Sequence, residues 1–367
     1  MSSLPRAAAE KACLLIADIS GYTEYLVGVE LDHAHDVLAD LLTVVVGSLD
    51  PFFRLAKLEG DAALMWTPAV ELDGSTLLDR VESCYFGFRR RLLSIRQATT
   101  CDCNACVLIP NLNLKMVVHH GDVIRHRVAG YEELVGQDVI IVHRLLKNTV
   151  TENLGAAAYA FLTDSCLAAT TLDPEKLGMQ RHHESYDVVG EVAGWVHDLE
   201  QAWTTEQERT QVYVSAEEGF WSITGELDAP AHVVWEYVTA PQHRSRWLVG
   251  VTAVNQNAPS SRRGVGTTNH CMHGEEATIE EILDWRPPNY VTVLTRPPGL
   301  PSVLMTHEVI PTEHGARWES RIQLRRPEDR ALLEPALPVL GQNLEASLEV
   351  LRALLADEVP VDATPPG

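Results

Sequence analysis

The segment LAKLEGDAALMW, Leu55–Trp66, joins two apolar, strand-like runs through a turn that carries three charged residues. Gly60 is the natural bend, because glycine adopts left-handed backbone conformations without steric cost. The pattern predicts a β-hairpin. A hairpin does not need Lys57, Glu59 and Asp61 in order to fold. These charges therefore either form a solvated turn or belong to a functional site.

The sequence before and after this hairpin alternates between strand and helix patterns. CLLIADI, Cys13–Ile19, is an almost continuous apolar run, which is typical of a central strand buried on both faces. Apolar residues at three- and four-residue steps between Leu38 and Leu49 predict a helix that ends before Pro51. Further helices are expected over residues 77–95 and 136–148, and strands over LNLKMVVHHG, AYAFLT and GWVHDLE. The alternation favours an α+β domain with a mixed or mainly antiparallel sheet.

A second domain is predicted after a polar segment that lacks apolar periodicity. Its order is one strand, FWSITGEL, a helical stretch over residues 230–247, six strand-like runs and a long helix with a leucine stripe from Leu337 to Leu351. A curved antiparallel sheet wrapped around that last helix would bury the stripe. The predicted boundaries are 11–200 for the first domain, 201–217 for a linker, 218–357 for the second domain and 358–367 for a disordered tail.

Composition limits the classes of function. The 367 residues are 46% hydrophobic, and the net charge of -22 argues against a protein that binds the nucleic acid backbone or an anionic membrane. No apolar run approaches the roughly 20 residues of a membrane span, and the first residues lack a secretory signal, so we expect a cytoplasmic protein. The seven cysteines fit reduced thiols better than a disulfide framework.

Two aspartates stand at neighbouring points of the predicted sheet. Asp18 ends the buried strand before a glycine-containing turn at Gly21, and Asp61 lies in the hairpin. Such a carboxylate pair suits Mg²⁺ or Mn²⁺, and backbone N–H groups of the turn suit phosphate. The alternative is structural, with a helix cap at Asp18 and a plain turn at Gly60.

Three blocks of the sequence resemble, in order, the signature blocks of class III nucleotidyl cyclase catalytic domains. The blocks are LLIADISGYTEYL, KLEGDAALMW and VVHHGDV followed by VAGYEELVGQDVIIVHRLL. The resemblance extends over about Lys11–Glu200 and implies a ferredoxin-like nucleotide cyclase fold. It implies cyclisation of ATP or GTP to a 3′,5′-cyclic nucleotide, and a homodimer in which one domain supplies the metal ligands and the other the base contacts.

The resemblance also assigns roles to individual residues. The metal ligands would be Asp18, Asp61 and the carbonyl of Ile19. The phosphate-facing turn would be Gly21, Tyr22 and Thr23. The base would be read by Lys57 and Glu133. Arg144 would stabilise the charge that develops on the transferred phosphate, as such reactions require.

The sequence departs from the family pattern at two positions. Ile140 stands where the family carries an asparagine that positions the ribose, and its side chain cannot hydrogen-bond. The family's late lysine, which holds the terminal phosphates, falls near Val189. Losing a transition-state donor commonly costs about a hundredfold or more in rate. Two interpretations follow: a slow cyclase, or a non-catalytic ligand sensor whose cyclase domain is a platform for dimerisation or nucleotide binding. More narrowly, the sequence resembles a bacterial subgroup without an established activity.

The short motif CDCNAC brings three thiols together. Cys101, Cys103 and Cys106 would supply part of a tetrahedral Zn²⁺ site or an iron–sulfur cluster, with His119, His120 or Cys84 as a distant fourth ligand. The alternative is a loop of reduced thiols, because local spacing does not complete a set of four ligands.

The second domain resembles the START-like helix-grip superfamily, which includes polyketide cyclases (SRPBCC proteins) and lipid-transfer domains. The resemblance implies a cavity between sheet and helix for a small hydrophobic ligand that would modulate the first domain. Candidate lining residues are Trp235, Trp247, His270, Met272, Trp285, Met305, His307 and Trp318. The alternative is that these side chains fill the core. A third hypothesis, that this domain is the enzyme, lacks a convergent polar set in the sequence.

Overall fold

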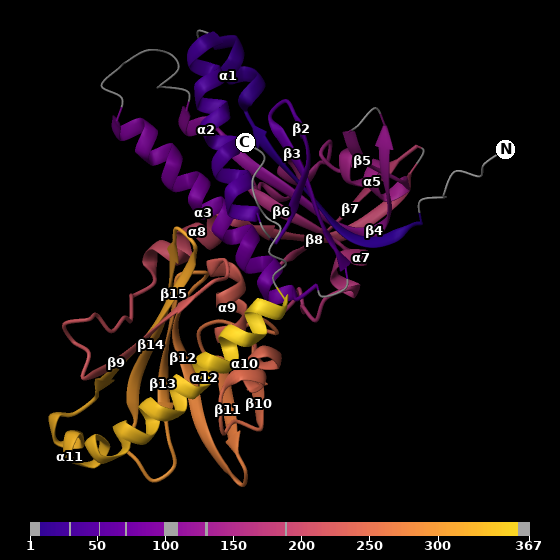
Figure 1. Ribbon diagram of the computed structural model, residues 1–367. Helices are drawn as coiled ribbons and strands as arrows, with labels where there is room; N and C mark the ends of the chain where they lie inside the picture. Colours follow the sequence, from indigo (N-terminus) through magenta and orange to yellow (C-terminus); the bar gives the residue numbers. More distant parts are fainter. Residues whose placement is uncertain are drawn as a thin grey trace. The chain divides into compact units, whose positions relative to one another are not determined.

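The computed structural model describes residues 8–28, 31–50, 52–69, 72–98, 109–128, 131–187 and 189–358, and the chain divides into two compact units after Arg209 (Figure 1). The predicted linker, 201–217, is not a free segment. Helix α8, Leu199–Glu208, buries Trp203 in the core of the first unit. Farther along, the backbone N–H of Val212 donates to the buried carboxylate of Asp284 at 2.9 Å, in the second unit. Both ends of the predicted linker are therefore packed structure.

The first unit is built on a mixed sheet. Its described residues form eight strands in the order β2-β3-β1-β4-β6-β8-β7, with β5 paired to β4. Only the β4–β6 pair is parallel among these strands. The strands are β1 (Glu10–Ser20), β2 (Arg54–Glu59), β3 (Ala62–Pro68), β4 (Asn113–Val128), β5 (Tyr131–Val135), β6 (Tyr159–Thr163), β7 (Gln180–Tyr186) and β8 (Gly190–Asp198).

Helices cover both faces of this sheet. Besides α8 they are α1 (Tyr22–Gly28), α2 (Leu31–Leu49), α3 (Gly74–Ala98), α5 (Gln137–Arg144), α6 (Val150–Leu154) and α7 (Asp164–Ala168). Successive side chains of β1 point alternately into two hydrophobic cores, one on each face of the sheet. Leu15 and Ala17 belong to the core with α2 and α3, whereas Leu14 and Ile16 belong to the core with α5. The prediction of a central strand buried on both faces is confirmed.

Strands β4 and β7 differ from the sequence-based expectation. Strand β4 continues past Gly121, where the pattern predicted its end, because this glycine leaves room for a side chain of α5. A Cβ at Gly121 would lie 2.1 Å from Cγ of Asp138. Strand β7 was not expected, because its alternating polar sequence RHHES buries only His182 and Glu184.

The second unit is an antiparallel sheet with a long helix packed against it. In its described part the strand order is β10-β11-β12-β13-β14-β15-β9. The strands are β9 (Trp221–Leu227), β10 (Ala253–Asn257), β11 (Thr268–His273), β12 (Glu276–Arg286), β13 (Tyr290–Arg296), β14 (Val303–Thr312) and β15 (Gly315–Leu324). The helices are α9 (Ala231–Thr239), α10 (Pro241–Trp247), α11 (Arg330–Leu333) and α12 (Leu337–Glu358). The α+β class predicted for both domains is confirmed.

Helix α12 lies across the sheet as the leucine stripe predicted (Figure 1). Leu348 and Leu351 are buried on it, and Gly225 of β9 permits the close approach, because a Cβ there would lie 2.6 Å from Cδ2 of Leu348. This is the helix-grip arrangement. The helix reaches Glu358, and the remainder of the predicted tail lies outside the described residues. None of the helices in the described ranges has the length and apolarity that a membrane span requires.

We expect the stripe on α12 to hold the second unit together. Leu351→Ala deletes a fully buried side chain, so it should lower the free energy of unfolding by about 2–5 kcal/mol. Leu332→Ala, at an exposed leucine of α11, should change it by no more than about 0.5 kcal/mol. Urea unfolding of both variants checks this, and equal losses would contradict the packing described.

Candidate functional site

The end of β1 and the turn of the β2–β3 hairpin lie against each other. The backbone N–H of Ile19 donates to the carbonyl of Asp61 at 3.1 Å. In the strand pairing, Asp18 stands opposite Ala62 on one side and opposite Lys115 on the other. Two aspartates separated by more than forty positions in the chain are thereby brought to one end of the sheet, as predicted.

The electrostatics of this end reflect two neighbouring carboxylates. Burial and, to a smaller extent, the negative charge of Asp61 together raise the pKa of Asp18 to about 6, although the positive charge of Lys115 opposes both effects. Burial and then Asp61 also raise the pKa of the Tyr22 phenol. Like charges held together in a partly buried place disfavour ionisation, and a divalent cation relieves that repulsion.

The donor set fits a hard cation that is shared with a ligand. Asp18, Asp61 and the Ile19 carbonyl are oxygen donors, which Mg²⁺ and Mn²⁺ prefer. Nowhere in the described ranges, this end of the sheet included, do three His, Cys, Asp or Glu side chains converge on a metal position, so Asp18 and Asp61 are a pair of side-chain donors. Two carboxylates leave the other coordination positions of Mg²⁺ to water and phosphate oxygens, which is usual beside nucleotides.

The turn after Asp18 is formed by Gly21, whose φ of +85° favours glycine. A Cβ at this position would lie 3.0 Å from the carbonyl oxygen of Asn111. Tyr22 is only 8% exposed and packs beside Tyr25 in the core, so its side chain does not face a phosphate. The backbone of Thr23 lies in α1, and its side chain is outside the described residues.

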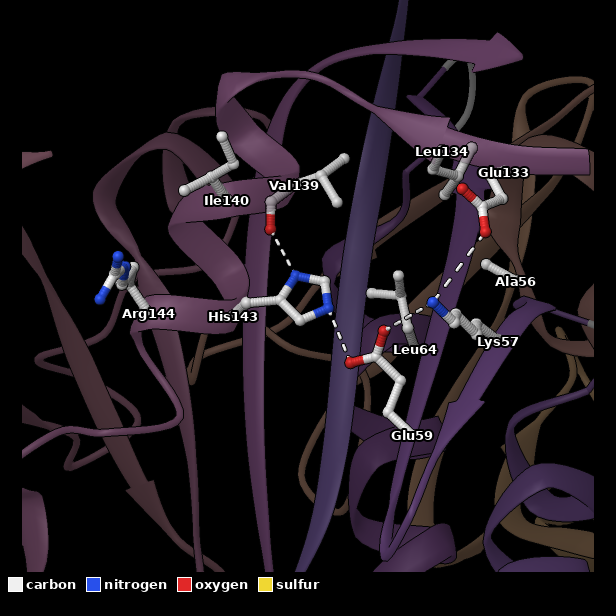
Figure 2. Close-up of a pocket in the computed structure, with 10 residues that line it drawn as sticks. All are labelled: Ala56, Lys57, Glu59, Leu64, Glu133, Leu134, Val139, Ile140, His143 and Arg144. Carbon is white, nitrogen blue, oxygen red and sulfur yellow. Dashed lines mark hydrogen bonds and ion pairs between the residues drawn. The ribbon is translucent and has the colours of Figure 1, made fainter. Parts of the chain in front are cut away.

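A pocket of about 320 Å³ lies between the hairpin and α5 (Figure 2). Its lining comes from β2, β3, β5 and α5 and comprises Ala56, Lys57, Glu59, Leu64, Glu133, Leu134, Val139, Ile140, His143 and Arg144. The residues predicted to read the base and to stabilise the transferred phosphate, Lys57, Glu133 and Arg144, thus line one pocket. The lining does not include Asp18 or Asp61, so these two candidate cation ligands do not line this pocket.

Lys57 lies between two carboxylates in this pocket. Its Nζ is 3.6 Å from Oε1 of Glu59 and 4.0 Å from Oε1 of Glu133 (Figure 2). All three side chains are at least partly exposed, so these ion pairs are weak and can rearrange around a ligand. An ammonium donor and a carboxylate acceptor are therefore available side by side.

Glu59 and His143 form a pair that the sequence analysis did not assign. Nδ1 of His143 lies 2.6 Å from the carbonyl oxygen of Val139, and its Nε2 lies 2.9 Å from Oε2 of Glu59. A carbonyl oxygen only accepts, so Nδ1 carries a hydrogen and donates it to Val139. Helical spacing could have revealed His143, because it stands one turn after Ile140.

The other side of α5 presents Ile140 and Arg144. Ile140 is 55% exposed at the pocket rim. Figure 2 shows the guanidinium of Arg144 turned away from Lys57. Arg144 is exposed, and no carboxylate among the described residues forms a salt bridge with it. An unpaired arginine at the edge of a pocket suits an anionic ligand.

The start of α5 is tied to the sheet by one aspartate. Oδ1 of Asp138 lies 3.0 Å from Nε2 of His119, and its Oδ2 accepts the backbone N–H of Asp122 at 2.6 Å. On its other side, Nδ1 of His119 is 2.9 Å from the hydroxyl of Thr163. The buried histidine therefore has a structural role, and it fixes the helix that carries the pocket residues.

Cys101, Cys103 and Cys106 lie outside the described residues. Of the distant ligands considered, Cys84 is fully buried and its Sγ lies 3.7 Å from the carbonyl oxygen of Val45. Burial raises the pKa of that thiol well above its usual range, which disfavours the thiolate that zinc requires.

The cavity candidates of the second unit separate into two groups. Six of them pack in the core that the inner face of the sheet forms with α9, α10 and α12: Trp235, Trp247, Trp285, Met305, His307 and Trp318. The prediction was wrong for His270 and Met272, which alternate with the buried residues Asn269 and Cys271 and so point to the opposite face of β11.

The interior of this unit also holds charges that the sequence did not reveal. Arg244 of α10 donates to both carboxylate oxygens of Glu280 of β12, at 2.6 and 2.9 Å, and both side chains are buried. The expectation that no polar set converges in this domain was therefore wrong. The two residues are distant in sequence and lie on a helix and a strand whose packing no local pattern specifies.

Comparison with known proteins identifies two matching family models and one related protein. Residues 38–154 match the family described as a protein of unknown function (DUF2652), and residues 221–356 match the family described as polyketide cyclase / dehydrase and lipid transport. The Mycobacterium tuberculosis protein named "Uncharacterized protein Rv2561/Rv2562" is 36% identical over 165 residues, which are 44% of this chain and 73% of that protein. The chain belongs to the family of this mycobacterial protein.

Among solved structures, the first unit resembles class III cyclases. A bacterial light-regulated adenylyl cyclase is 12% identical, with 54% of this chain and 56% of that chain covered and a TM-score of 0.39. The adenylyl cyclase CyaB from Pseudomonas aeruginosa is also 12% identical, with 52% and 95% covered and a TM-score of 0.37. These likenesses concern the fold and carry no conclusion about activity.

The raised pKa of Asp18 predicts how stability depends on pH in the metal-free protein. The folded-state pKa of about 6 lies above the ordinary value of 3.8. The contribution of Asp18 to the free energy of unfolding is therefore most favourable below about pH 4. It falls as pH rises through about 4 to 6, and the loss is complete above that range. In EDTA, Asp18→Asn should raise the melting temperature near pH 7.5 and have little effect near pH 4. Asp122→Asn, an exposed control, should show no such dependence. A gain from Asp18→Asn that is the same at both pH values would contradict the assignment.

Proposed function

We propose that the first unit binds a nucleoside triphosphate together with Mg²⁺ or Mn²⁺ and converts it slowly to a 3′,5′-cyclic nucleotide. The observation that carries the proposal is the pocket lined by Lys57, Glu133 and Arg144, which come from three separate elements. Lys57 offers a hydrogen-bond donor and Glu133 an acceptor to the edge of a base, and the unpaired guanidinium of Arg144 offers donors to a phosphate at the rim of the pocket. The adjacent carboxylates of Asp18 and Asp61 provide for the cation.

Each residue has a defined part in this proposal. Asp18 and Asp61 hold the cation, which supplies positive charge beside the reacting oxygens when bound. Lys57 donates to a ring nitrogen of the base, and Glu133 accepts from an exocyclic amine, which favours adenine. Arg144 donates to the phosphoryl oxygens as the ribose 3′ oxygen attacks the α-phosphorus and pyrophosphate leaves.

A second copy of the chain would complete the site. The metal-binding group and the base-binding pocket are distinct groups of residues in one chain, so a single nucleotide is expected to use one group from each of two protomers. Exposed apolar residues stand beside the pocket, including Leu55 and Leu58 on the edge strand β2 and Ile140 on α5. Covering these side chains favours association.

The second unit would serve as a ligand-binding module. Six of the predicted cavity residues lie in its core, between the sheet and the helices packed against it. A match to a family described as polyketide cyclase / dehydrase and lipid transport supports an apolar ligand. The ligand would then modulate the nucleotide site of the first unit.

The decisive assay measures cyclic AMP formed from ATP by the purified protein with Mg²⁺ or Mn²⁺. Asp61→Ala removes a cation ligand and should lower product formation at least about a hundredfold. Asp122→Ala removes an exposed carboxylate outside the site and should leave the rate unchanged. Equal product from the wild type and Asp61→Ala would end the enzymatic proposal.

Restoring the missing donor gives an independent test. Ile140→Asn places an amide at the pocket rim, where the resemblance implies contact with the ribose. We expect kcat to rise by about tenfold or more, because the new hydrogen bond would strengthen in the transition state. Ile140→Leu serves as the size-matched control without a donor. A drop in activity for the asparagine variant, with the fold intact by circular dichroism, would contradict the proposed orientation of the nucleotide.

A second candidate function is a non-catalytic sensor. The exposed Ile140 favours the sensor, because isoleucine stands where the cyclase family carries an asparagine. The site therefore lacks a hydrogen-bonding side chain at this position, and the surface beside the pocket is more apolar. Calorimetry with ATP and Mg²⁺ separates the two functions. Tight binding without product supports the sensor, whereas the absence of binding reduces the first unit to a dimerisation platform.

A further inference from the structure

Three buried polar atoms cluster on the inner face of the second sheet. They are Nδ1 of His307, Nε1 of Trp318 and Oγ of Ser320, and none has a hydrogen-bond partner among the residues that the structure describes. Trp318 is 1% exposed and Ser320 is 0% exposed. Native proteins rarely leave such atoms unpaired, because each one forfeits its hydrogen bonds with water. A group from outside the protein would satisfy them together.

The three side chains occupy one small area. His307 of β14 and Ser320 of β15 stand directly opposite each other in the strand pairing, and Trp318 is two residues from Ser320, on the same face. The imidazole of His307 stacks on the indole of Trp318, with ring centroids 5.8 Å apart and planes inclined by 13°. One ligand group can therefore reach all three.

The apolar side chains beside them are not completely buried. Met305 and Ile223 on the inner face, and Leu344 on α12, pack against the core but remain partly accessible. His307 also keeps some accessible surface, although burial lowers its pKa to about 4. His307, Ser320 and Ile223 stand in one row across β14, β15 and β9, so the imidazole borders the space that these partly accessible side chains share.

The charge of this interior favours an uncharged ligand. The buried guanidinium of Arg244 is paired with Glu280 through two hydrogen bonds, and that of Arg263 is paired with Glu236 at 3.2 Å. His307 is uncharged near neutral pH because its pKa is depressed. No unpaired cation therefore faces this space from the described inner-face residues. The indole N–H donates, the serine hydroxyl both donates and accepts, and the imidazole Nδ1 can do either, which suits a carbonyl or hydroxyl group.

The apolar surroundings indicate the rest of the molecule. Trp318 also meets the ring of Trp247 edge-on, with centroids 5.8 Å apart, and Met305 pairs with Ile322 across β14 and β15. Flat rings pack well against indole and thioether groups. We propose that the helix-grip interior binds an uncharged aromatic molecule through a carbonyl or hydroxyl group held by His307, Trp318 and Ser320. This rests on the ligand-binding role proposed for the second unit.

Three matched probes test the chemistry on the full-length protein by calorimetry at neutral pH. Naphthalene has only the ring body, 2-naphthol adds an uncharged hydroxyl, and 2-naphthoate adds a negative charge. We expect 2-naphthol to bind about tenfold more tightly than naphthalene, the gain of about one good hydrogen bond. The naphthoate should bind more weakly than the naphthol, because its charge finds no unpaired cation.

Variants of two of these side chains show which residues produce the preference for 2-naphthol. Ser320→Ala and Trp318→Phe each remove one unpaired polar atom and keep most of the side-chain volume. Each should reduce the preference for 2-naphthol over naphthalene several-fold, and Ser320→Ala, which removes least volume, should leave the melting temperature of the free protein unchanged or higher. A residue with a purely structural role would instead lower the melting temperature when changed. His270→Leu, on the opposite face of β11, should alter neither property.

The outcomes are distinguishable. Equal affinity for naphthol and naphthalene overturns the polar recognition and leaves an apolar ligand-binding role in place. Tightest binding of the naphthoate overturns the preference for an uncharged ligand. Binding of none of the three contradicts the ligand-binding role of this unit and the present inference with it. A preference for naphthol that survives in both variants shows that other residues hold the hydroxyl and overturns the assignment.

Discussion

The pairing of β1 with β3 on one side and β4 on the other is the constraint on which the first unit depends. This register ends β1 beside the hairpin turn, so that Ile19 hydrogen-bonds the backbone of Asp61 and Asp18 stands opposite Lys115. The same strand separates two cores. A shift of the register by one residue would exchange the buried faces and remove Asp18 from its neighbours. The core and the candidate cation site are therefore fixed by one set of hydrogen bonds.

The first unit combines a rigid frame with an adaptable pocket. Asp138 and His119 anchor the start of α5 to buried sheet residues, whereas Lys57, Glu59 and Glu133 form exposed ion pairs that cost little to rearrange. A site for a charged ligand benefits from this combination, because the backbone holds the positions while the side chains exchange protein partners for ligand groups. The second unit shows the reverse, with a buried Arg244–Glu280 bridge held by two hydrogen bonds and a patch of unpaired neutral groups beside it.

The sequence predicted what depends on local pattern and on ordered motifs. The strand at Cys13–Ile19, the helix before Pro51 and the stripe on α12 follow from apolar periodicity, and the structure confirms all three. The placement of Lys57, Glu133 and Arg144 in one pocket agrees with their positions in the second and third blocks. The Arg244–Glu280 pair, the Glu59–His143 pair and the extension of β4 through Gly121 were missed, because each depends on tertiary contacts between segments far apart in the chain. The assignment of His270 and Met272 failed because residue type alone does not give the side of a strand.

The most direct test of the account measures cation binding rather than turnover. Electron paramagnetic resonance can count Mn²⁺ bound to the protein in the presence of a non-hydrolysable ATP analogue, for the wild type and for Asp61→Ala. If Asp18 and Asp61 share the cation with the triphosphate, the wild type should bind Mn²⁺ in addition to that held by the free analogue, and the variant should lose this binding. Identical Mn²⁺ binding by the two proteins would contradict the shared-cation site.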